Sequence, residues 1–405
     1  RPFLKWMAVP IAATTILCFL PVWNSEKIVT DHSYAVRVFL VITICYVIWT
    51  MVYTVADVPY WGLSSCMTND TIVRGNILTF ARLVCTFGAG LVTVGVPLIT
   101  SAATAKYKGP DGAVLPEYIY DNAHTLKWTY FICCLVLALS AVPMFIHGFK
   151  NTTERFTTTD APPSFSHNIK LLFKNKQLLL VVLSGVLGGA RTVYTYTGGL
   201  YFAKYVLKNE GMYSLITLLV VPGGLVASIL VPWMTKKFTK KWAYIYVHIL
   251  GAVVMTAMYF VGYDTKWKLI LAAIGLVLLG IPQGVNNIIT YAMIGDTVDY
   301  LEWKTGERGE GICFAMQTLI SKIGMAIGAF IGVFSYNWAN INPTAADGVY
   351  ITPQGEKTLW NLLVLSGAVS MVGTIIPMLF YNISEKKQAQ MVKEIAERKA
   401  ASESE

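Results

Sequence analysis

Charged residues are scarce in this sequence, and their scarcity excludes an ordinary soluble enzyme. Only 14% of the 405 residues are Asp, Glu, Lys or Arg, and 55% are hydrophobic, whereas about a quarter of the residues in soluble domains are charged. The mean hydropathy is +0.54. This composition predicts a protein whose outer surface faces lipid, with aromatic side chains available for the two membrane interfaces.

The sequence also lacks the common patterns of metal and disulfide sites. The seven cysteines are odd in number and show neither a disulfide framework nor the spacing of zinc ligands. The five histidines are scattered and form no His-Glu-x-x-His pattern. We therefore expect no metal site, no covalent cofactor and no enzyme activity.

Long apolar stretches account for most of the chain. A helix needs about 20 residues to cross the hydrocarbon core of a bilayer, and ten stretches are long enough. They are roughly residues 4–23, 35–63, 77–100, 127–148, 178–203, 212–234, 243–263, 268–294, 311–338 and 359–381. The sequence therefore predicts an all-α, polytopic membrane protein.

The basic residues indicate how these spans are oriented. Ten spans place both chain ends on one side, and when the connecting segments are assigned to alternate sides, one side holds 19 of the 32 Lys and Arg and the other holds ten. By the positive-inside rule the richer side is the cytoplasm, so we expect a cytoplasmic C-terminus. The net charge of +9 is then a topology signal, and the expected partner is the lipid bilayer and not nucleic acid.

The longest connection on this side divides four spans from six. It contains Pro162-Pro163 and runs of Thr and Ser, which are typical of a linker. Residues 384–401 suit either a short amphipathic helix with Ser384 as its N-cap or a solvated tail. We predict an N-terminal helix bundle at 1–148, a cytoplasmic linker at 149–177, a six-helix bundle at 178–382 and a cytoplasmic tail at 383–405.

Four ionisable residues lie within the apolar stretches, where a charge is costly unless it is paired or used. They are Asp57, Arg82, Arg191 and Lys322. Asp57 and Arg82 are equidistant from the loop that joins their two spans, so we expect them to face each other, each roughly 18 Å along its helix from the turn. Such a pair either holds two spans together or binds a polar solute in a water-filled cavity.

The neighbours of Asp57 favour binding. Tyr53, Asp57, Tyr60 and Trp61 have the spacing of one helical face. A carboxylate accepts hydroxyl protons from a sugar, and a flat indole covers its C–H side. The alternative for the aromatic residues is an ordinary interface belt.

A second polar set lies on later spans. Gln317 and Thr318 precede Lys322 by about one turn, and reflection through the preceding loop places Lys322 level with Asn286. Arg191 follows Gly188-Gly189-Ala190, where it either lines the cavity or binds a loop carbonyl at a helix break.

Charges of both signs are concentrated in the segment that contains Asp296, Asp299, Glu302 and Arg308. Ion pairs in such a segment lock one state of a transporter and break as its bundles rock; the alternative is a solvated face. Arg74-Gly75 and Arg308-Gly309 each follow a short acidic loop, the first of which contains Asp70. This weak internal repeat makes Asp70 and Arg74 candidates for the same charge network.

Three motifs together resemble one family, the glycoside–pentoside–hexuronide:cation symporters. They are Tyr53-Thr-Val-Ala-Asp57-Val-Pro-Tyr-Trp61, Gly295-Asp-Thr-Val-Asp299-Tyr-Leu-Glu302-Trp-Lys-Thr-Gly306, and Gln317-Thr318 with Lys322. The resemblance implies a major facilitator fold of twelve helices, of which these ten spans would be the third to twelfth. Arg1-Pro2-Phe3 resembles the loop before the family's third span, so we expect that this sequence is N-terminally truncated and lacks the first two helices.

The resemblance also implies roles for particular residues. Asp57 and Arg82 match the family's sugar-binding acid and arginine, Trp61 its stacking tryptophan, and Tyr53 and Thr54 neighbouring pocket residues. Gln317, Thr318 and Lys322 match the pocket wall of the eleventh helix. Arg191 matches no family motif; it could favour an anionic solute such as a hexuronide.

The implied function is cation-coupled uptake of a glycoside, pentoside or hexuronide across the bacterial inner membrane by alternating access. The coupling cation would be Na⁺ or H⁺, with Li⁺ a further option, and most of its site would lie on the first two helices, so no cation-binding acid is named. The alternatives are a major facilitator carrier for a non-sugar solute and a non-transporting membrane sensor.

Overall fold

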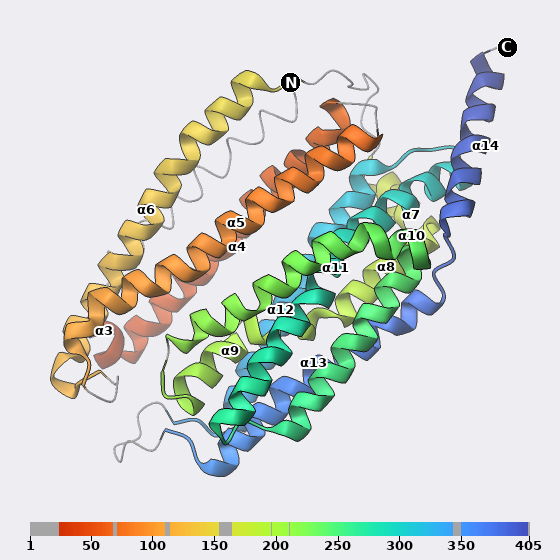
Figure 1. The fold of residues 1–405 in the computed structure, drawn as a ribbon. Coiled ribbons are helices and arrows are strands. Elements are labelled where there is room, and N and C mark those ends of the chain that lie inside the picture. Colours follow the sequence, from red (N-terminus) through yellow and green to blue (C-terminus); the bar gives the residue numbers. More distant parts are fainter. Residues whose placement is uncertain are drawn as a thin grey trace. The chain divides into compact units, whose positions relative to one another are not determined.

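The computed structural model describes residues 24–67, 71–109, 114–153, 164–195, 197–209, 211–342 and 350–403. The chain divides into two compact units, residues 1–161 and 162–405, which Figure 1 shows as helical. Within the described residues the only β-type pairing is an isolated bridge between Lys108 and Val114. The predicted all-α architecture is therefore confirmed.

In its described residues the first unit consists mainly of three long helices, in which α5 contacts both α4 and α6. Each is longer than a bilayer requires, since 20 residues suffice. The described helices of this unit are α3 (Ser25–Thr30), α4 (His32–Met67), α5 (Thr71–Thr104), two short 3-10 turns (Ala105–Tyr107 and Pro116–Tyr118) and α6 (Ile119–Asn151).

The second unit carries the remaining helices, and the boundary before Pro162 falls within the segment 149–177 that we predicted as a linker. In part of that segment Ser164 caps a helix, accepting from the backbone N–H of His167 at 3.3 Å. The elements are α7 (Phe165–Lys174), α8 (Lys176–Leu187), the 3-10 segment η4 (Gly189–Thr195), α9 (Thr197–Tyr201), the π-helix η5 (Phe202–Val206), α10 (Met212–Val261), α11 (Lys266–Thr305), α12 (Glu310–Trp338), α13 (Pro353–Leu379) and α14 (Glu385–Glu403).

Helix α10 is two spans joined at a sharp break. Thr239 has φ 67° and ψ 156°, which no helix accommodates. Both halves meet the same stretch of α11, because Gly223 packs against Gly280 while Gly251 lies against Pro282. The chain therefore folds back at Thr239, in agreement with the sequence analysis, which predicted two separate spans at 212–234 and 243–263.

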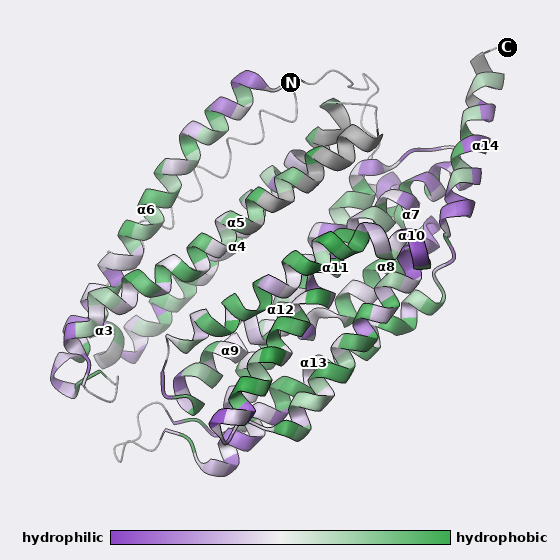
Figure 2. Cartoon of the chain, viewed as in Figure 1, coloured by the Kyte–Doolittle hydropathy of each residue, from purple (hydrophilic) through white to green (hydrophobic). Residues whose placement is uncertain are grey.

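Eight helices in the described part of the chain are long and apolar enough to cross a membrane. Since α10 holds two of the predicted spans, these eight helices account for nine of the ten predicted spans. The first predicted span, residues 4–23, lies outside the described residues. Figure 2 shows hydrophobic residues along these helices and hydrophilic residues on α14. We predicted either a helix or a solvated tail at 384–401, and a helix is observed.

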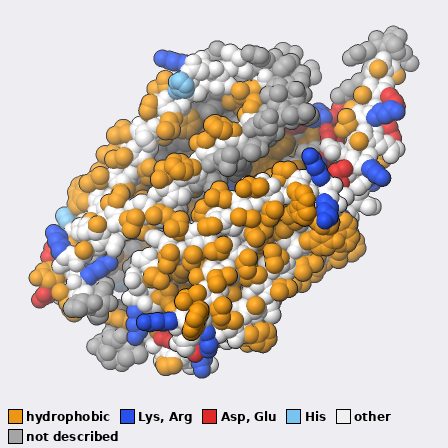
Figure 3. All heavy atoms as spheres, viewed as in Figure 1, with side chains coloured by type: hydrophobic (Ala, Val, Ile, Leu, Met, Phe, Trp, Pro, Cys, Tyr) orange, Lys and Arg blue, Asp and Glu red, His pale blue; other side chains and the backbone are white. Residues whose placement is uncertain are grey.

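Large apolar side chains cover the outer surface of the second unit, as Figure 3 shows. Ile229 and Phe260 on α10 are each 78% exposed, and Val369 on α13 is 71% exposed. Contact with water would cost about 25 cal/mol for each Å² of this surface, whereas lipid tails solvate it. The interior instead holds small residues that let helices approach closely, such as Gly189 of η4, where an added Cβ would lie 3.0 Å from Gly324 Cα of α12.

One predicted span, 178–203, is not a regular helix. It begins as α8 and continues through η4, α9 and the π-helix η5. Glycine makes this path feasible, because a Cβ at Gly199 would overlap the carbonyl oxygen of Tyr194 and one at Gly198 would lie 2.9 Å from that of Val193. Irregular backbone at membrane depth is tolerated where it is packed against protein, and η4 is packed against α12 and α13.

Candidate functional site

The carboxylate of Asp57 is the centre of a polar face on α4. Trp61 Nε1 donates to Asp57 Oδ1 at 3.0 Å, and Tyr53 Oη donates to the same oxygen at 3.4 Å. The three residues are spaced by four, which brings them onto one side of the helix. Asp57 and Trp61 are half-buried, and Tyr53 is exposed. The structure thus brings together three of the predicted site residues, with two donors fixing the orientation of one carboxylate.

Aromatic rings extend this face toward the start of α4. Trp49 stacks on Tyr53 with ring centroids 5.6 Å apart, and Tyr46 stacks on Trp49 at 6.0 Å. Thr54 donates to the backbone oxygen of Thr50 at 2.7 Å. Sequence analysis did not name Tyr46 and Trp49 as part of this face, although their spacing of seven and four residues from Tyr53 is the signal that could have identified them.

The partner predicted for Asp57 lies on the next helix. Arg82 belongs to α5, which contacts α4, but the placement of its side chain lies outside the described part of the structure, as does that of Arg74; Asp70 lies outside the described residues altogether. Since α4 ends at Met67 and α5 begins at Thr71, Asp57 and Arg82 are at similar distances along their helices from the connection. The ion pair between them stays a prediction.

In the second unit, Asn286 is the hub of a buried hydrogen-bond network. Its side-chain oxygen accepts from Tyr244 Oη at 3.1 Å and from Thr290 Oγ1 at 3.3 Å. Tyr244 Oη also lies 3.3 Å from Ser184 Oγ, which donates to the carbonyl oxygen of Thr374 at 2.8 Å. The network therefore joins α8, α10, α11 and α13.

His248 and Gln317 are among the further polar side chains that this unit buries. His248 is fully buried, and its Nδ1 lies 2.8 Å from the carbonyl oxygen of Tyr244; His248 Nε2 and Gln317 Oε1 have no hydrogen-bond partner among the described residues. Thr318 and Lys322 are half-buried on α12. Their grouping with Asn286 stays a prediction, because the hydrogen bonds described for Asn286 go to α10 and to its own helix.

Sequence analysis missed Ser184 on α8 and Tyr244 and His248 on the second half of α10. Tyr244 and His248 are spaced by four, with rings 4.2 Å apart, and Asn286 and Thr290 repeat that spacing. This spacing of four between polar residues within apolar runs is the sequence signal that could have identified them.

Arg191 lies at the break after α8. Its Nη1 donates to the carbonyl oxygen of Gly188 at 2.8 Å, which is one of the two arrangements that we considered. The guanidinium fills the space beside Gly188. A Cβ added at Gly188 would overlap Arg191 Nη1 and would lie 2.6 Å from Thr374 Oγ1. Whether Arg191 contacts a solute stays a prediction.

A network of charges lies at the end of α11. Arg308 contacts Glu302 at 2.6 Å, Glu310 at 2.7 Å and Asp299 at 3.3 Å. Its partial burial disfavours the charged form, but the hydrogen bonds and charges of Glu302 and Glu310 outweigh this cost and raise the pKa of Arg308 above its ordinary value. These described ion pairs lie within the second unit; their predicted role in locking one bundle to the other stays a prediction.

Asp296 belongs to the same end of α11 and is 4% exposed. Lys240, beside the break in α10, pairs with it at 2.6 Å, and the backbone N–H of Lys240 donates to Glu385 at the start of α14 at 2.7 Å. A buried carboxylate is costly unless it is paired and hydrogen-bonded, and this lysine meets that requirement. The pair therefore connects the α10 turn with α11.

The C-terminal helix α14 packs onto this charged end. Trp303 Nε1 donates to Glu394 Oε2 at 2.6 Å, and Arg398 Nη1 donates to the backbone oxygen of Trp303 at 2.8 Å. Gln388 adds a bond to Asp299 at 3.2 Å, and Met391 is 2% exposed. The hydrogen bond from Trp303, assisted by one from Gln390, lowers the pKa of Glu394.

Comparison with known proteins gives the decisive observation, because the family model described as "MFS/sugar transport protein" matches residues 1–385. The chain belongs to this family. The expected major facilitator fold and the resemblance to the glycoside–pentoside–hexuronide:cation symporters are confirmed. This MFS protein is accordingly a multi-pass membrane transporter of the sugar-transport family and not an enzyme.

Relatives of this MFS protein include named sugar carriers. A "glucuronide carrier protein homolog" from Escherichia coli is 26% identical over 98% of this chain and 80% of its own length. An "isoprimeverose transporter" from Lactiplantibacillus pentosus is 24% identical over 82% of this chain and 64% of its own length. A "putative sulfoquinovose importer" from E. coli is 23% identical over 98% and 78%. These proteins support sugar transport as the general activity of the family member described here.

Proposed function

We propose that this protein is a cation-coupled symporter that takes up a glycoside, pentoside or hexuronide across the bacterial inner membrane by alternating access. Membership of the MFS/sugar transport family supports a sugar as the transported solute. The excess of basic residues on one set of connecting segments supports a cytoplasmic location for α14 and for the charged end of α11. Na⁺ or H⁺ supplies the driving gradient, with Li⁺ as a further candidate.

The observation that carries the proposal is the geometry around Asp57. A carboxylate accepts at about four lone-pair positions, and Trp61 Nε1 and Tyr53 Oη both donate to Oδ1. Two donors on one oxygen hold the carboxylate in a fixed orientation, so a sugar that donates its hydroxyl protons to the group meets a preorganised acceptor. The indole beside it provides the flat apolar surface that the C–H face of a pyranose requires.

Arg82 in the first unit, and Gln317, Thr318, Lys322 and Asn286 in the second, are the further residues that we propose for sugar binding. Arg82 follows the connection after α4 at a distance similar to that of Asp57 before it, which favours a charge pair at one depth. Gln317 supports the proposed role of the residues in the second unit, since it is 6% exposed and its Oε1 has no partner among the described residues. A buried oxygen of this kind favours a ligand or water that donates to it.

The ion pairs around Arg308 are proposed to hold one end of the transporter closed. Three carboxylates within 3.3 Å of one guanidinium keep the α11–α12 connection rigid. A rigid connection of this kind supports rocking of whole bundles. Asp70 and Arg74 in the first unit are the proposed counterparts of the charged residues around Arg308.

Uptake by cells that express the complete gene tests the proposal. Asp57→Asn keeps the side-chain volume but removes the charge that strengthens a hydrogen bond to a hydroxyl, so we expect uptake to be abolished at normal membrane expression. Asp264→Asn is the matched control, because Asp264 is exposed and its described ion pair, to Lys268 four residues later at 2.6 Å, is local. Near-normal uptake by Asp57→Asn would contradict the proposed site.

Vesicles made from the same cells test the coupling. A panel of galactosides, xylosides and glucuronides is added while Na⁺ and H⁺ movements are recorded. We expect one member to drive cation entry in the wild type and none to do so in Asp57→Asn. Solute uptake that drives no cation entry would refute the coupling, and transport of a peptide or drug instead of every sugar would refute the substrate class.

A further inference from the structure

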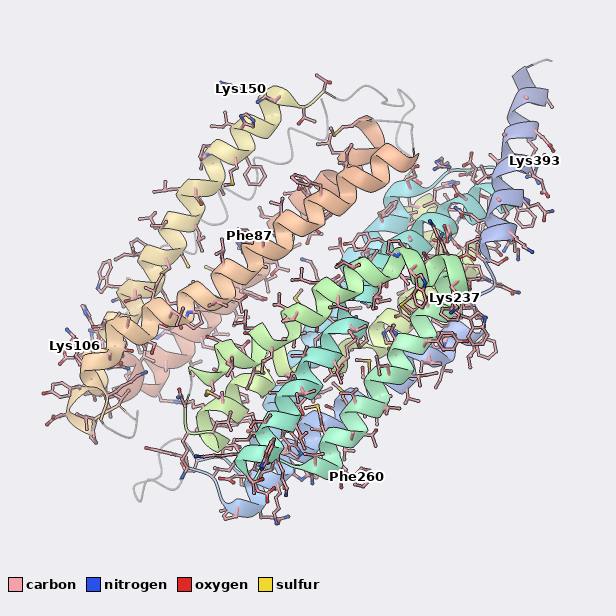
Figure 4. The ribbon with its side chains drawn as sticks, in the orientation of Figure 1. Phe87, Lys106, Lys150, Lys237, Phe260 and Lys393 are labelled. Carbon is pink, nitrogen blue, oxygen red and sulfur yellow. The ribbon has the colours of Figure 1, made fainter. Side chains whose placement is uncertain are left out.

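The turn at the middle of α10 is rich in lysine. Lys236, Lys237, Lys240 and Lys241 surround Thr239, where the helix folds back. We refer to these four residues as the basic turn. Figure 4 labels Lys237 at this end of α10, and Figure 3 shows Lys and Arg side chains gathered here beside the hydrophobic surface of the unit.

Two lysines of the basic turn already have structural partners. Lys240 pairs with Asp296 at 2.6 Å. Lys241 Nζ donates to the carbonyl oxygens of Leu379 at 2.7 Å and Tyr381 at 2.8 Å, so it closes the end of α13. These two charges stabilise the unit itself.

The other two lysines face outward. Lys236 and Lys237 are exposed, and no carboxylate within the described ranges forms a salt bridge with either one. Lys237 Nζ lies 5.1 Å from the centre of the Trp233 ring and 5.3 Å from that of Phe238. The outward side of the basic turn therefore presents two uncompensated positive charges next to aromatic surface.

Exposed aromatic rings flank these charges on both halves of the helix. Trp233 is 54% exposed before the turn, and Trp242 and Tyr246 are each 44% exposed after it. Trp242 stacks on Tyr246 with centroids 5.8 Å apart, and Phe238 contacts Trp233 at 6.0 Å and Tyr246 at 5.4 Å. Trp and Tyr gather at the level of lipid headgroups, where one end of the ring system is apolar and the other is hydrated.

The surface beyond the aromatic rings is suited to acyl chains. Ile229 before the turn is 78% exposed, and Val253 after it is 60% exposed. A molecule that fits this surface must combine a negative headgroup with long apolar tails. Free phosphate has no tails to cover the apolar surface, and nucleic acid would leave it in water.

We propose that the basic turn binds the headgroup of an anionic phospholipid. The phosphodiester forms ion pairs with the ammonium groups of Lys236 and Lys237, Trp233 and Trp242 flank the headgroup, and the acyl chains follow the two halves of α10. The bound lipid thereby covers the turn from which Lys240 reaches Asp296, and it adds to the hydrophobic contacts that hold both halves against α11.

The test measures lipid selectivity of the purified intact transporter. Energy transfer from protein tryptophan to pyrene-labelled phosphatidylglycerol is compared with transfer to pyrene-labelled phosphatidylcholine in neutral nanodiscs. We expect the wild type to prefer phosphatidylglycerol and Lys236→Gln/Lys237→Gln to lose about five-fold in preference for each lysine. Lys236→Arg/Lys237→Arg keeps both charges and is expected to keep the preference.

The control is Lys266→Gln/Lys268→Gln, which removes two charges near the other end of the second half of α10. Lys268 there pairs with Asp264 at 2.6 Å, so its charge is already compensated, and Trp267 is 74% exposed. We expect this variant to retain the wild-type preference. An equal loss in both glutamine variants, no loss in either, or displacement of the lipid by inorganic phosphate at constant ionic strength would overturn the proposal.

Discussion

The contact between α10 and α11 depends on glycine at residue 280, and a single methyl group tests it. In Gly280→Ala the new Cβ would overlap the carbonyl oxygen of Val220, and it would lie 2.8 Å from Gly223 Cα and 2.9 Å from Gly224 N. Non-bonded carbon atoms pack at about 3.5–4.0 Å. Because these three nearest atoms all belong to the backbone, no rotamer change relieves the overlap, and the two helices must move apart by about 1 Å.

Overpacking of this kind costs about 1–3 kcal/mol, and the rigid surroundings place Gly280→Ala toward the upper end. Gly295→Ala on the same helix is the control, since no atom lies within 4 Å of its added Cβ. We expect heating in detergent, followed by size-exclusion chromatography, to show a lower unfolding temperature for Gly280→Ala only. Equal temperatures for Gly280→Ala and the wild type would refute the packing argument.

Three further predictions concern the sugar face, the C-terminal helix and the start of α8. Trp61→Ala should weaken sugar binding more than Trp61→Phe, measured by titration calorimetry, because phenylalanine keeps a flat ring; equal losses would contradict stacking. The pKa of Glu394 is lower in the folded protein than the value of about 4.3 in the unfolded chain. The hydrogen bond from Trp303 to Glu394 therefore stabilises the docked α14 at full strength above about pH 4.3, and this stabilisation is lost as the pH falls through the pKa of the folded protein. The anisotropy of a dye at residue 400 should therefore fall in acid, and Glu394→Gln should remove this transition. Asn175→Ala loses the cap on Leu178 N and the bond to Thr297 O, so the free energy of unfolding should fall by about 2–3 kcal/mol with sugar affinity unchanged.

The membrane spans could be predicted because they depend on local composition. Apolar runs set the helices, and the four lysines between 236 and 241 separated the two halves of α10 correctly. The irregular path through Gly188 and Gly199 was not predicted as a whole. It depends on backbone contacts within η4 and α9 and on the fit of η4 against α12, and a hydropathy pattern contains neither kind of information.

The candidate site was predictable where it is helical and local. The spacing of Tyr53, Asp57 and Trp61 was enough to place them on one face, and their hydrogen bonds follow from that spacing. The network of Tyr244 with Asn286 and Ser184 was not predicted, since these residues are 42 and 60 positions from Tyr244. Only tertiary packing brings their spans together.

Direct measurement of sugar affinity tests the central claim that the Asp57 carboxylate binds the transported sugar. Hydrogen bonds to a charged group contribute about 1.5–3 kcal/mol each, so Asp57→Asn in the purified intact protein should bind the transported sugar about 10- to 100-fold more weakly than the wild type, while Asp264→Asn binds it normally. Equal affinity of Asp57→Asn and the wild type, in protein that remains folded, would contradict the account.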